Sequence, residues 1–233
     1  MDSPYILEET DNFAVVFKPP KMHCAPSGAK LQKDDTLLEW YSAQSPCFDI
    51  MHRLDFETHG LVLFAKNEKS YEAFKTLQDN GEFIKEYSAV CTKADVATQL
   101  KGFPEYSKAT SQPPFEIESY FRPFGPGRKL VRPVIEDGKK HKEIAKDKGG
   151  FYKTEITNIN GNVFTARIKR GFRHQIRCHL CWIGFPIQND PLYSRFDGEG
   201  ILPGGNLALR AYSLVFDDPV SGKKCEYRIA AFE

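Results

Sequence analysis

Residues 52–66 read His52-Arg53-Leu54-Asp55-Phe56-Glu57-Thr58-His59-Gly60-Leu61-Val62-Leu63-Phe64-Ala65-Lys66. The run places an arginine and an aspartate two positions apart, shortly before a glycine and an apolar segment. The β-branched and aromatic content of 61–65 predicts a short buried strand, and Gly60 can adopt the backbone angles of a loop that enters it. Asp55 is therefore expected on a loop at the edge of a sheet.

Two interpretations of Asp55 follow from this run alone. A loop on a rigid sheet presents a side chain in a fixed position, and catalytic groups are concentrated on such loops. Asp55 can equally be a structural turn residue that pairs with Arg53.

The run resembles the catalytic motif H-R-L-D-x-x-T-S-G-L-x-L-x-A-K of the RluA-type pseudouridine synthases. Further stretches resemble other motifs of this family in the same order: 18–20 its early Lys-Pro, 85–90 its K-x-Y-x-A-x-V strand, 171–193 its G-R-x-H-Q-I-R-x-H-L segment with the G-x-P-I-x-G-D-x-x-Y that follows, and 207–219 its closing strand. The resemblance spans nearly the whole chain and is weakest between residues 101 and 150.

This resemblance implies an α+β fold with a mixed, largely antiparallel sheet core, flanked by helices and loops around a central active-site cleft. We expect residues 1–233 to form a single catalytic domain with a variable, loop-rich insertion at about 101–150. Only seventeen residues precede Lys18, so no separate N-terminal RNA-binding domain is expected.

Composition limits the remaining possibilities. A chain of 233 residues can bury a full core. No signal peptide or membrane span is evident, so we expect a soluble, cytoplasmic protein. The six cysteines are scattered along the chain, so we expect free thiols rather than disulfides. We expect a monomer with no obligate protein partner.

The net charge of +1 conceals two basic segments. Residues 122–148 hold nine Lys or Arg against four acids, and 156–189 hold five basic residues and no acid. Local basic stretches on an otherwise acidic chain are typical of local phosphate binding, although such runs can also be ordinary solvated surface.

Hydrophobic periodicity and turn residues predict strands over 13–18, 83–92 and 163–169, a possible strand over 115–121, and helices over 35–42, 68–80 and 174–183. Asn67 is a candidate cap for the helix over 68–80, and Gly81 follows its end. In the strand over 83–92, Tyr87 shares its face with small neighbours, which leaves room for a flat group against its ring.

The third motif contains residue types that can bind a metal ion. His174, Cys178 and Cys181 lie three and four positions apart on one helical face, within reach of one ion. Zinc needs four ligands, or three and a water, and no second paired motif completes the set. We expect no metal and no cofactor.

The resemblance implies isomerisation of uridine to pseudouridine in a tRNA or ribosomal RNA. Asp55 would be the reacting acid, Arg177 the guanidinium beside it, and Tyr87 the ring that stacks on the uracil. Arg53 resembles the arginine that enters the space left by the flipped nucleotide. The residues expected to bind RNA are Arg53, Lys169, Arg170, Arg173 and His174.

The chain departs from the family motifs at several positions. His59 stands where the family has Ser, Phe172 where it has Arg, and Arg210 and Asp218 where it often has His. Asn189 and Ser194 replace glycines. None of these changes removes the expected catalytic residues. We do, however, expect the substrate specificity of this chain to differ from that of the family.

Two other functions remain open from the sequence. The chain could be a catalytically silent RNA-binding or RNA-folding module on the same scaffold, with His59 and Phe172 as the relevant changes. It could also be a carboxylate glycosidase, for which Glu57 is the nearest second acid in the sequence.

Overall fold

The computed structural model describes residues 3–26, 36–93, 102–106, 112–135, 151–193 and 205–233. The chain divides into two compact units: Met1–Tyr87 with Leu209–Ala231, and Ser88–Ala208 with Phe232–Glu233. Strand β5 (Ile84–Val90) runs from the first unit into the second. The prediction of one catalytic domain stays a prediction, because a domain can contain two compact units.

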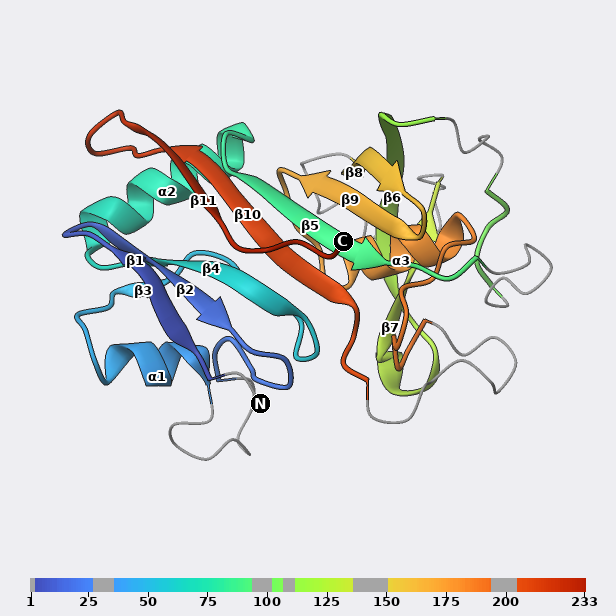
Figure 1. The fold of residues 1–233 in the computed structure, drawn as a ribbon, viewed down its shortest axis with the longest axis horizontal. Helices are drawn as coiled ribbons and strands as arrows, with labels where there is room; N and C mark the ends of the chain where they lie inside the picture. The colour runs from blue at the N-terminus through green and yellow to red at the C-terminus, as the bar shows by residue number, and fades with distance from the viewer. Residues whose placement is uncertain (1–2, 27–35, 94–101, 107–111, 136–150, 194–204) are drawn as a thin grey trace. The chain divides into compact units, whose positions relative to one another are not determined.

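The first unit is built on a mixed sheet (Figure 1). Its strands are β1 (Tyr5–Glu9), β2 (Phe13–Lys18), β3 (Asp49–Ile50), β4 (His59–Ala65), β10 (Leu209–Asp217) and β11 (Lys224–Arg228). The order is β1-β2-β4-β10, with β3 paired to β4 and β11 to β10. Every pairing is antiparallel except that of β4 with β10.

The first unit also contains two helices, and capping residues in the sequence determine where each helix begins. Helix α1 (Leu37–Ser42) begins after Thr36, which forms a reciprocal capping box with Glu39. Helix α2 (Glu68–Asn80) is capped by Asn67 and ends at Gly81 in the left-handed conformation, so its predicted bounds are confirmed.

The core of the first unit is rich in aromatic residues. Phe13, Phe74, Phe83 and Phe216 are buried, and their rings meet edge to face at centroid distances of 5.3 to 5.6 Å. Such pairs add roughly 1 kcal/mol each to the free energy of area burial. Burial of Phe74 places this face of α2 against the sheet.

The second unit is an antiparallel sheet in the order β9-β8-β6-β7. Its strands are β6 (Phe115–Phe124), β7 (Leu130–Val134), β8 (Tyr152–Asn160) and β9 (Val163–Ile168). The 3₁₀ turn η2 (Pro126–Arg128) joins β6 to β7. In this unit the sequence predicted strands over 115–121 and 163–169. The second is confirmed as β9, β6 is longer than expected, and β7 and β8 were missed.

Helix α3 (Gln175–Trp182) packs against β6, β7 and β8 of this unit, and all eight of its residues are buried. Phe172, just before it, stacks on Phe121 with ring centroids 5.1 Å apart. Phe172 thus extends the apolar cluster of this unit, where the family motif has an arginine.

Both units are dominated by sheets with few helices, which confirms the predicted α+β class and its largely antiparallel pairing. The central active-site cleft stays a prediction. Among the described helices, none combines the length and hydropathy that spanning a bilayer requires.

Candidate active site

Asp55 lies in the loop that connects β3 to β4 in the first unit. The backbone N–H of Thr58 donates to the carbonyl oxygen of Asp55 at 3.1 Å and closes a turn over the acid. The next residue, His59, already begins β4. Asp55 itself is only partly buried, whereas Leu54 and Thr58 are buried. The acid is therefore partly accessible on a loop that leads into a buried strand, as the sequence predicted.

Two buried side chains, those of Cys24 and Lys18, form hydrogen bonds with the backbone of this loop. The backbone N–H of Leu54 donates to Sγ of Cys24 at 3.1 Å, and that thiol lies 3.4 Å from the carbonyl oxygen of Leu54. On the other side of the acid, the ammonium of Lys18 donates to the carbonyl oxygen of Phe56 at 3.3 Å. The residues before and after Asp55 are thus each bonded to a different part of the 18–24 segment.

Lys18 also gives the loop a positive charge. It is fully buried at the end of β2, and its ammonium donates to the carbonyl oxygens of Pro19 and Met22 at 2.9 and 2.8 Å. Burial lowers the pKa of Lys18 to about 8, and the nearby charges, Asp55 among them, oppose that shift. Lys18 is therefore mostly protonated at neutral pH and places a buried positive charge beneath the Asp55 loop.

Tyr87 on β5 lies within electrostatic range of the acid. Burial raises the pKa of the Tyr87 hydroxyl, and the negative charge of Asp55 acts in the same direction. The phenol is therefore neutral at physiological pH. Its side chain is 6% exposed, so most of the ring is covered by protein. The structure brings together two of the three predicted catalytic residues in the first unit.

An exposed aromatic residue beside the acid was not predicted. Phe56 is 41% exposed, and its ring lies 4.7 Å from that of His23, centroid to centroid. Flat rings of this kind stack on splayed RNA bases. No periodicity in the sequence singles out Phe56, because its significance comes from its position next to Asp55 and from a contact 33 positions away.

The departure at His59 has a partner in the structure. His59 and Arg210 occupy paired positions on the parallel strands β4 and β10, and the Arg210 guanidinium donates to the His59 ring. The next pair, Gly60 and Ala211, is so close that a Cβ on Gly60 would lie 2.2 Å from the carbonyl oxygen of Ala211. Gly60 also has φ of +129°, a value that side chains rarely adopt.

The third predicted catalytic residue, Arg177, lies in α3 of the second unit. Its Nε and Nη2 donate to the two carboxylate oxygens of Asp190, both at 2.8 Å. Asp190 in turn accepts from the backbone N–H groups of Leu192 and Tyr193 at 2.9 and 3.1 Å. Both members of the ion pair are buried, so the direction of the guanidinium is fixed. The predicted pairing of Arg177 with Asp55 joins the two units and stays a prediction.

The cysteines of the third motif are structural. The thiol of Cys178 lies 3.5 Å from the carbonyl oxygen of Val131, and that of Cys181 lies 3.6 Å from the carbonyl oxygen of Tyr193. Burial raises the pKa of both thiols, so they are protonated at neutral pH. Among the described residues, no group of three His, Cys, Asp or Glu side chains is arranged to hold a metal ion.

The residues predicted to bind RNA have different environments. Arg53 and Lys169 are exposed. Arg170 lies over the ring of Tyr152, 4.3 Å from its centroid, and donates to its hydroxyl at 3.0 Å. Arg53 and Lys169 are thus accessible to solvent, whereas the guanidinium of Arg170 contacts Tyr152.

The other two predicted contacts are also engaged within the second unit. Arg173 donates from Nη2 to three backbone carbonyl oxygens at the end of the β6–β7 hairpin, at 2.7 to 3.2 Å. His174 has φ of +57°, and its Nδ1 lies 3.2 Å from the hydroxyl of Tyr193. Arg173 therefore supports the end of the hairpin, and His174 contacts the side chain of Tyr193.

Comparison with known proteins assigns the family. The model of the RNA pseudouridylate synthase family matches residues 12–182. An uncharacterized protein of Caenorhabditis elegans is 29% identical over 201 residues, which cover 81% of this chain but 38% of the relative. The dual-specificity RNA pseudouridine synthase RluA of Vibrio parahaemolyticus is 26% identical over 219 residues, covering 93% of this chain and 78% of that protein.

A solved structure has the same fold. Human RNA Pseudouridylate Synthase Domain Containing 1 is similar with a TM-score of 0.67 and 18% sequence identity, over 98% of this chain and 83% of that chain. Because the family model covers most of the sequence, the protein belongs to the RNA pseudouridylate synthase family, with RluA-type relatives.

Proposed function

We propose that this protein converts uridine in RNA to pseudouridine, with Asp55 as the reacting carboxylate. The observation that carries the proposal is the Asp55 loop: the acid is partly exposed, Cys24 and Lys18 bond to the backbone of the residues before and after it, and its charge acts on the hydroxyl of Tyr87. Family membership supports the same reaction.

The reaction is an isomerisation and is balanced without any other reactant. The bond between N1 of uracil and C1′ of ribose breaks, and a bond between C5 and C1′ forms. A proton leaves C5 and a proton is gained at N1, so no electrons are exchanged. A carboxylate that attacks or assists at one carbon, in a site that retains the detached uracil, meets these needs without a cofactor.

The remaining predicted residues have distinct roles in this proposal. In this proposal Tyr87 contacts the uracil, and Arg177 is the guanidinium partner of Asp55. Arg53, exposed two positions before Asp55, occupies the gap left by the extruded nucleotide.

Identification of the reaction product distinguishes this function from its alternatives. The protein is incubated with unmodified tRNA and ribosomal RNA transcripts, and the RNA is then digested to nucleosides. Pseudouridine is the expected product and disappears with Asp55→Ala. Free uracil would instead indicate a glycosidase. RNA binding with neither product would indicate a silent binding module.

The substrate is proposed to be a structured tRNA or ribosomal RNA. Mapping pseudouridine positions in RNA from cells with and without the protein identifies the site. The proposal predicts at least one position that is modified only when the protein is present. Identical maps would contradict it.

A further inference from the structure

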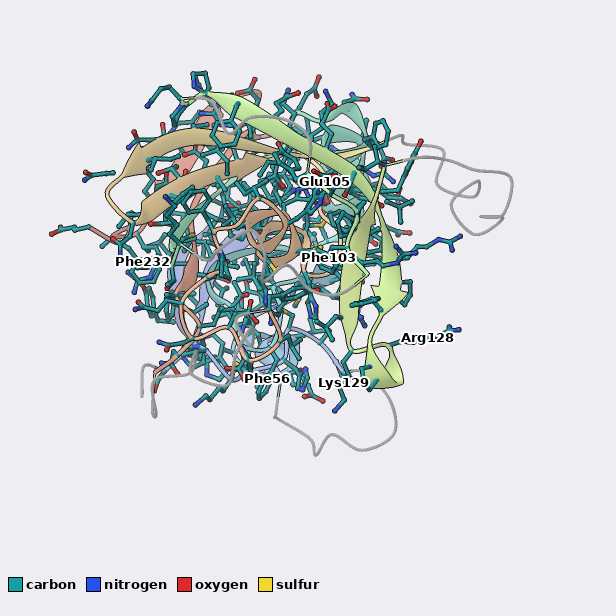
Figure 2. The ribbon with its side chains drawn as sticks, turned by 90° about the vertical axis from the view of Figure 1, so that its right-hand side faces the viewer. Phe56, Phe103, Glu105, Arg128, Lys129 and Phe232 are labelled. Carbon is teal, nitrogen blue, oxygen red and sulfur yellow. The ribbon has the colours of Figure 1, made fainter. Side chains whose placement is uncertain are left out.

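The hairpin formed by β6, η2 and β7 is strongly basic. Residues 119–135 hold four Lys or Arg and no acid. Two of them, Arg128 and Lys129, are exposed at the end of the hairpin, and Figure 2 shows them there. The other two, Arg122 and Arg132, lie directly opposite each other on the two strands. The hairpin therefore carries one cationic pair along its length and another at its end.

Such an arrangement is unfavourable for the protein alone. Like charges at directly opposed positions of antiparallel strands destabilise the pairing. Within the part of the chain that the structure describes, no ion pair joins these four cations to an acid, and Nε of Arg122 is buried without a hydrogen-bond partner. The charge in this hairpin is thus not balanced by the described protein around it.

A neighbouring cation in the same unit shows the opposite pattern. Lys153 on β8 forms ion pairs with Glu116 and Glu118 on β6, at 3.1 and 2.6 Å. The first half of β6 is therefore acidic and neutralised, whereas its second half, from Arg122 onward, is basic only. Charge is segregated along one strand, which an ordinary solvated surface does not require.

Arg173 makes the end of the hairpin rigid. Its Nη2 donates to the carbonyl oxygens of Arg128, Lys129 and Leu130 at 2.7, 3.2 and 3.1 Å. The turn itself uses left-handed backbone at Gly125, Gly127 and Arg128. A single guanidinium thus satisfies three carbonyl groups and adds a fifth positive charge at the place where Arg128 and Lys129 project.

We propose that the β6–β7 hairpin binds the phosphate backbone of the RNA substrate, through Arg122, Arg128, Lys129 and Arg132, and that Arg173 positions the end of the hairpin. This inference rests on the proposed function, because it names a surface for the same RNA. Guanidinium groups bind phosphate oxygens with paired hydrogen bonds. Arg122 and the turn are three residues apart, roughly 10 Å at 3.3 Å per residue, so the two cationic pairs reach different phosphates.

Contacts to phosphates can be counted from the salt dependence of RNA affinity. Each neutralised phosphate releases counterions, so log affinity falls with log salt by about 0.7 to 0.9 per contact. The double variant Arg128→Gln/Lys129→Gln should therefore lower the magnitude of this slope by about 1.5. Its affinity for an unmodified tRNA transcript at low salt should fall about tenfold or more.

The matched control is Lys75→Gln/Lys153→Gln, which removes two exposed lysines that are paired with acids in the structure. Its slope and affinity should stay within twofold of those of the unchanged protein. Equal slopes for the hairpin variant and the unchanged protein would overturn the inference. Equal losses in the control and the hairpin variant would also overturn it, because they would indicate a general effect of charge.

A second variant separates binding from folding. Arg122→Gln removes one member of the opposed pair and keeps the bond from Arg132 to the carbonyl oxygen of Gly102, so it should weaken RNA binding while the thermal midpoint stays the same or rises. A fall in both would indicate a structural role and contradict the inference.

The inference and the proposed function can fail separately. All binding measurements are repeated with Asp55→Ala, which cannot turn over in this account. If the hairpin variant loses its salt slope but the unchanged protein forms no pseudouridine, the isomerase proposal fails and the RNA surface stands. If pseudouridine forms and the hairpin variant binds RNA normally, only the hairpin inference fails.

Discussion

Nε of Arg210 donates a hydrogen bond of 2.9 Å to Nε2 of His59. These residues are 151 positions apart in the sequence, and each differs from the residue that RluA-type motifs usually have there. His59 is 7% exposed at the first position of β4, directly after the Asp55 loop, and Arg210 also donates to the carbonyl oxygen of Ala230. The two departures thus form one contact, which fixes the point where the loop enters the sheet.

The contact predicts coupled effects of substitution. His59→Ser and Arg210→His each remove the hydrogen bond and should lower the turnover number about tenfold, with little change in KM, since a bond to a charged group contributes about 1.5 kcal/mol. The double variant restores the residues that the family motifs have at both positions. We expect it to be several-fold more active than the product of the single effects predicts. Independent, multiplicative losses would contradict a shared role.

The buried pair of Arg177 and Asp190 predicts a large loss of stability. Asp190→Asn leaves the Arg177 charge buried against an amide, which should cost about 3 to 5 kcal/mol in the free energy of unfolding. Glu155→Gln is the control, because Glu155 and Arg167 form a pair that is about one-third exposed and should contribute at most about 1 kcal/mol. Urea denaturation measures both.

A compensating variant tests the proposed direction of Arg177. Arg177→Met/Asp190→Leu should recover much of the stability that Asp190→Asn loses, because no unpaired charge remains buried. It should still form no pseudouridine. An active double variant would show that Arg177 is only a structural residue.

A side chain at position 60 is expected to clash with β10 and to lower the stability of the first unit. Gly60→Ala places a Cβ 2.2 Å from the backbone of Ala211 at φ of +129°, so the free energy of unfolding should fall by about 3 kcal/mol. Gly161→Ala is the control: Gly161 also has positive φ, but nothing lies within 4 Å of the added Cβ. Its cost should be about 1 kcal/mol. Equal costs, measured by urea denaturation, would refute the close approach of β4 to β10.

Lys85 predicts how stability changes with pH. Lys85 is buried, and burial lowers its pKa from 10.5 to about 7. Between pH 7 and 10.5 the unfolded chain binds more protons at this site, so the Lys85 contribution to the free energy of unfolding rises with pH in that window. Below pH 7 the lysine is charged in both states, and its burial is fully unfavourable.

Lys85→Met isolates this contribution. The variant should be more stable than the unchanged protein at pH 6, and the difference should shrink as the pH rises to 10. Urea midpoints at four pH values provide the test. A difference that does not vary with pH would show that Lys85 does not titrate in this window.

Local signals in the sequence predicted the elements that local interactions determine. Asn67 and Gly81 set both ends of α2, and the apolar run from Phe13 set β2. Strand β7 was missed because Pro133 suggested a loop. The strand forms because it is the last in the sheet order of the second unit, and an edge strand tolerates a missing N–H donor.

The candidate site was predictable only in part, because sequence signals are local whereas the contacts that hold the site are long-range. The motif around Asp55 and its resemblance to a family predicted the acid and Tyr87. The contacts that hold the site, from Lys18 to the carbonyl of Phe56 and from Arg210 to His59, join positions 38 and 151 residues apart. No periodicity in the sequence records such pairs, because tertiary packing alone brings them together.

The most direct test of the central claim is tritium release from RNA labelled at C5 of uracil, because formation of the new carbon–carbon bond must expel that proton. Asp55→Asn keeps the size of the side chain and removes the carboxylate. The unchanged protein should release tritium in proportion to the pseudouridine formed, and Asp55→Asn should bind the RNA equally well but release it at least about a thousandfold more slowly. Equal release by the two proteins would contradict the assignment of Asp55 as the reacting acid.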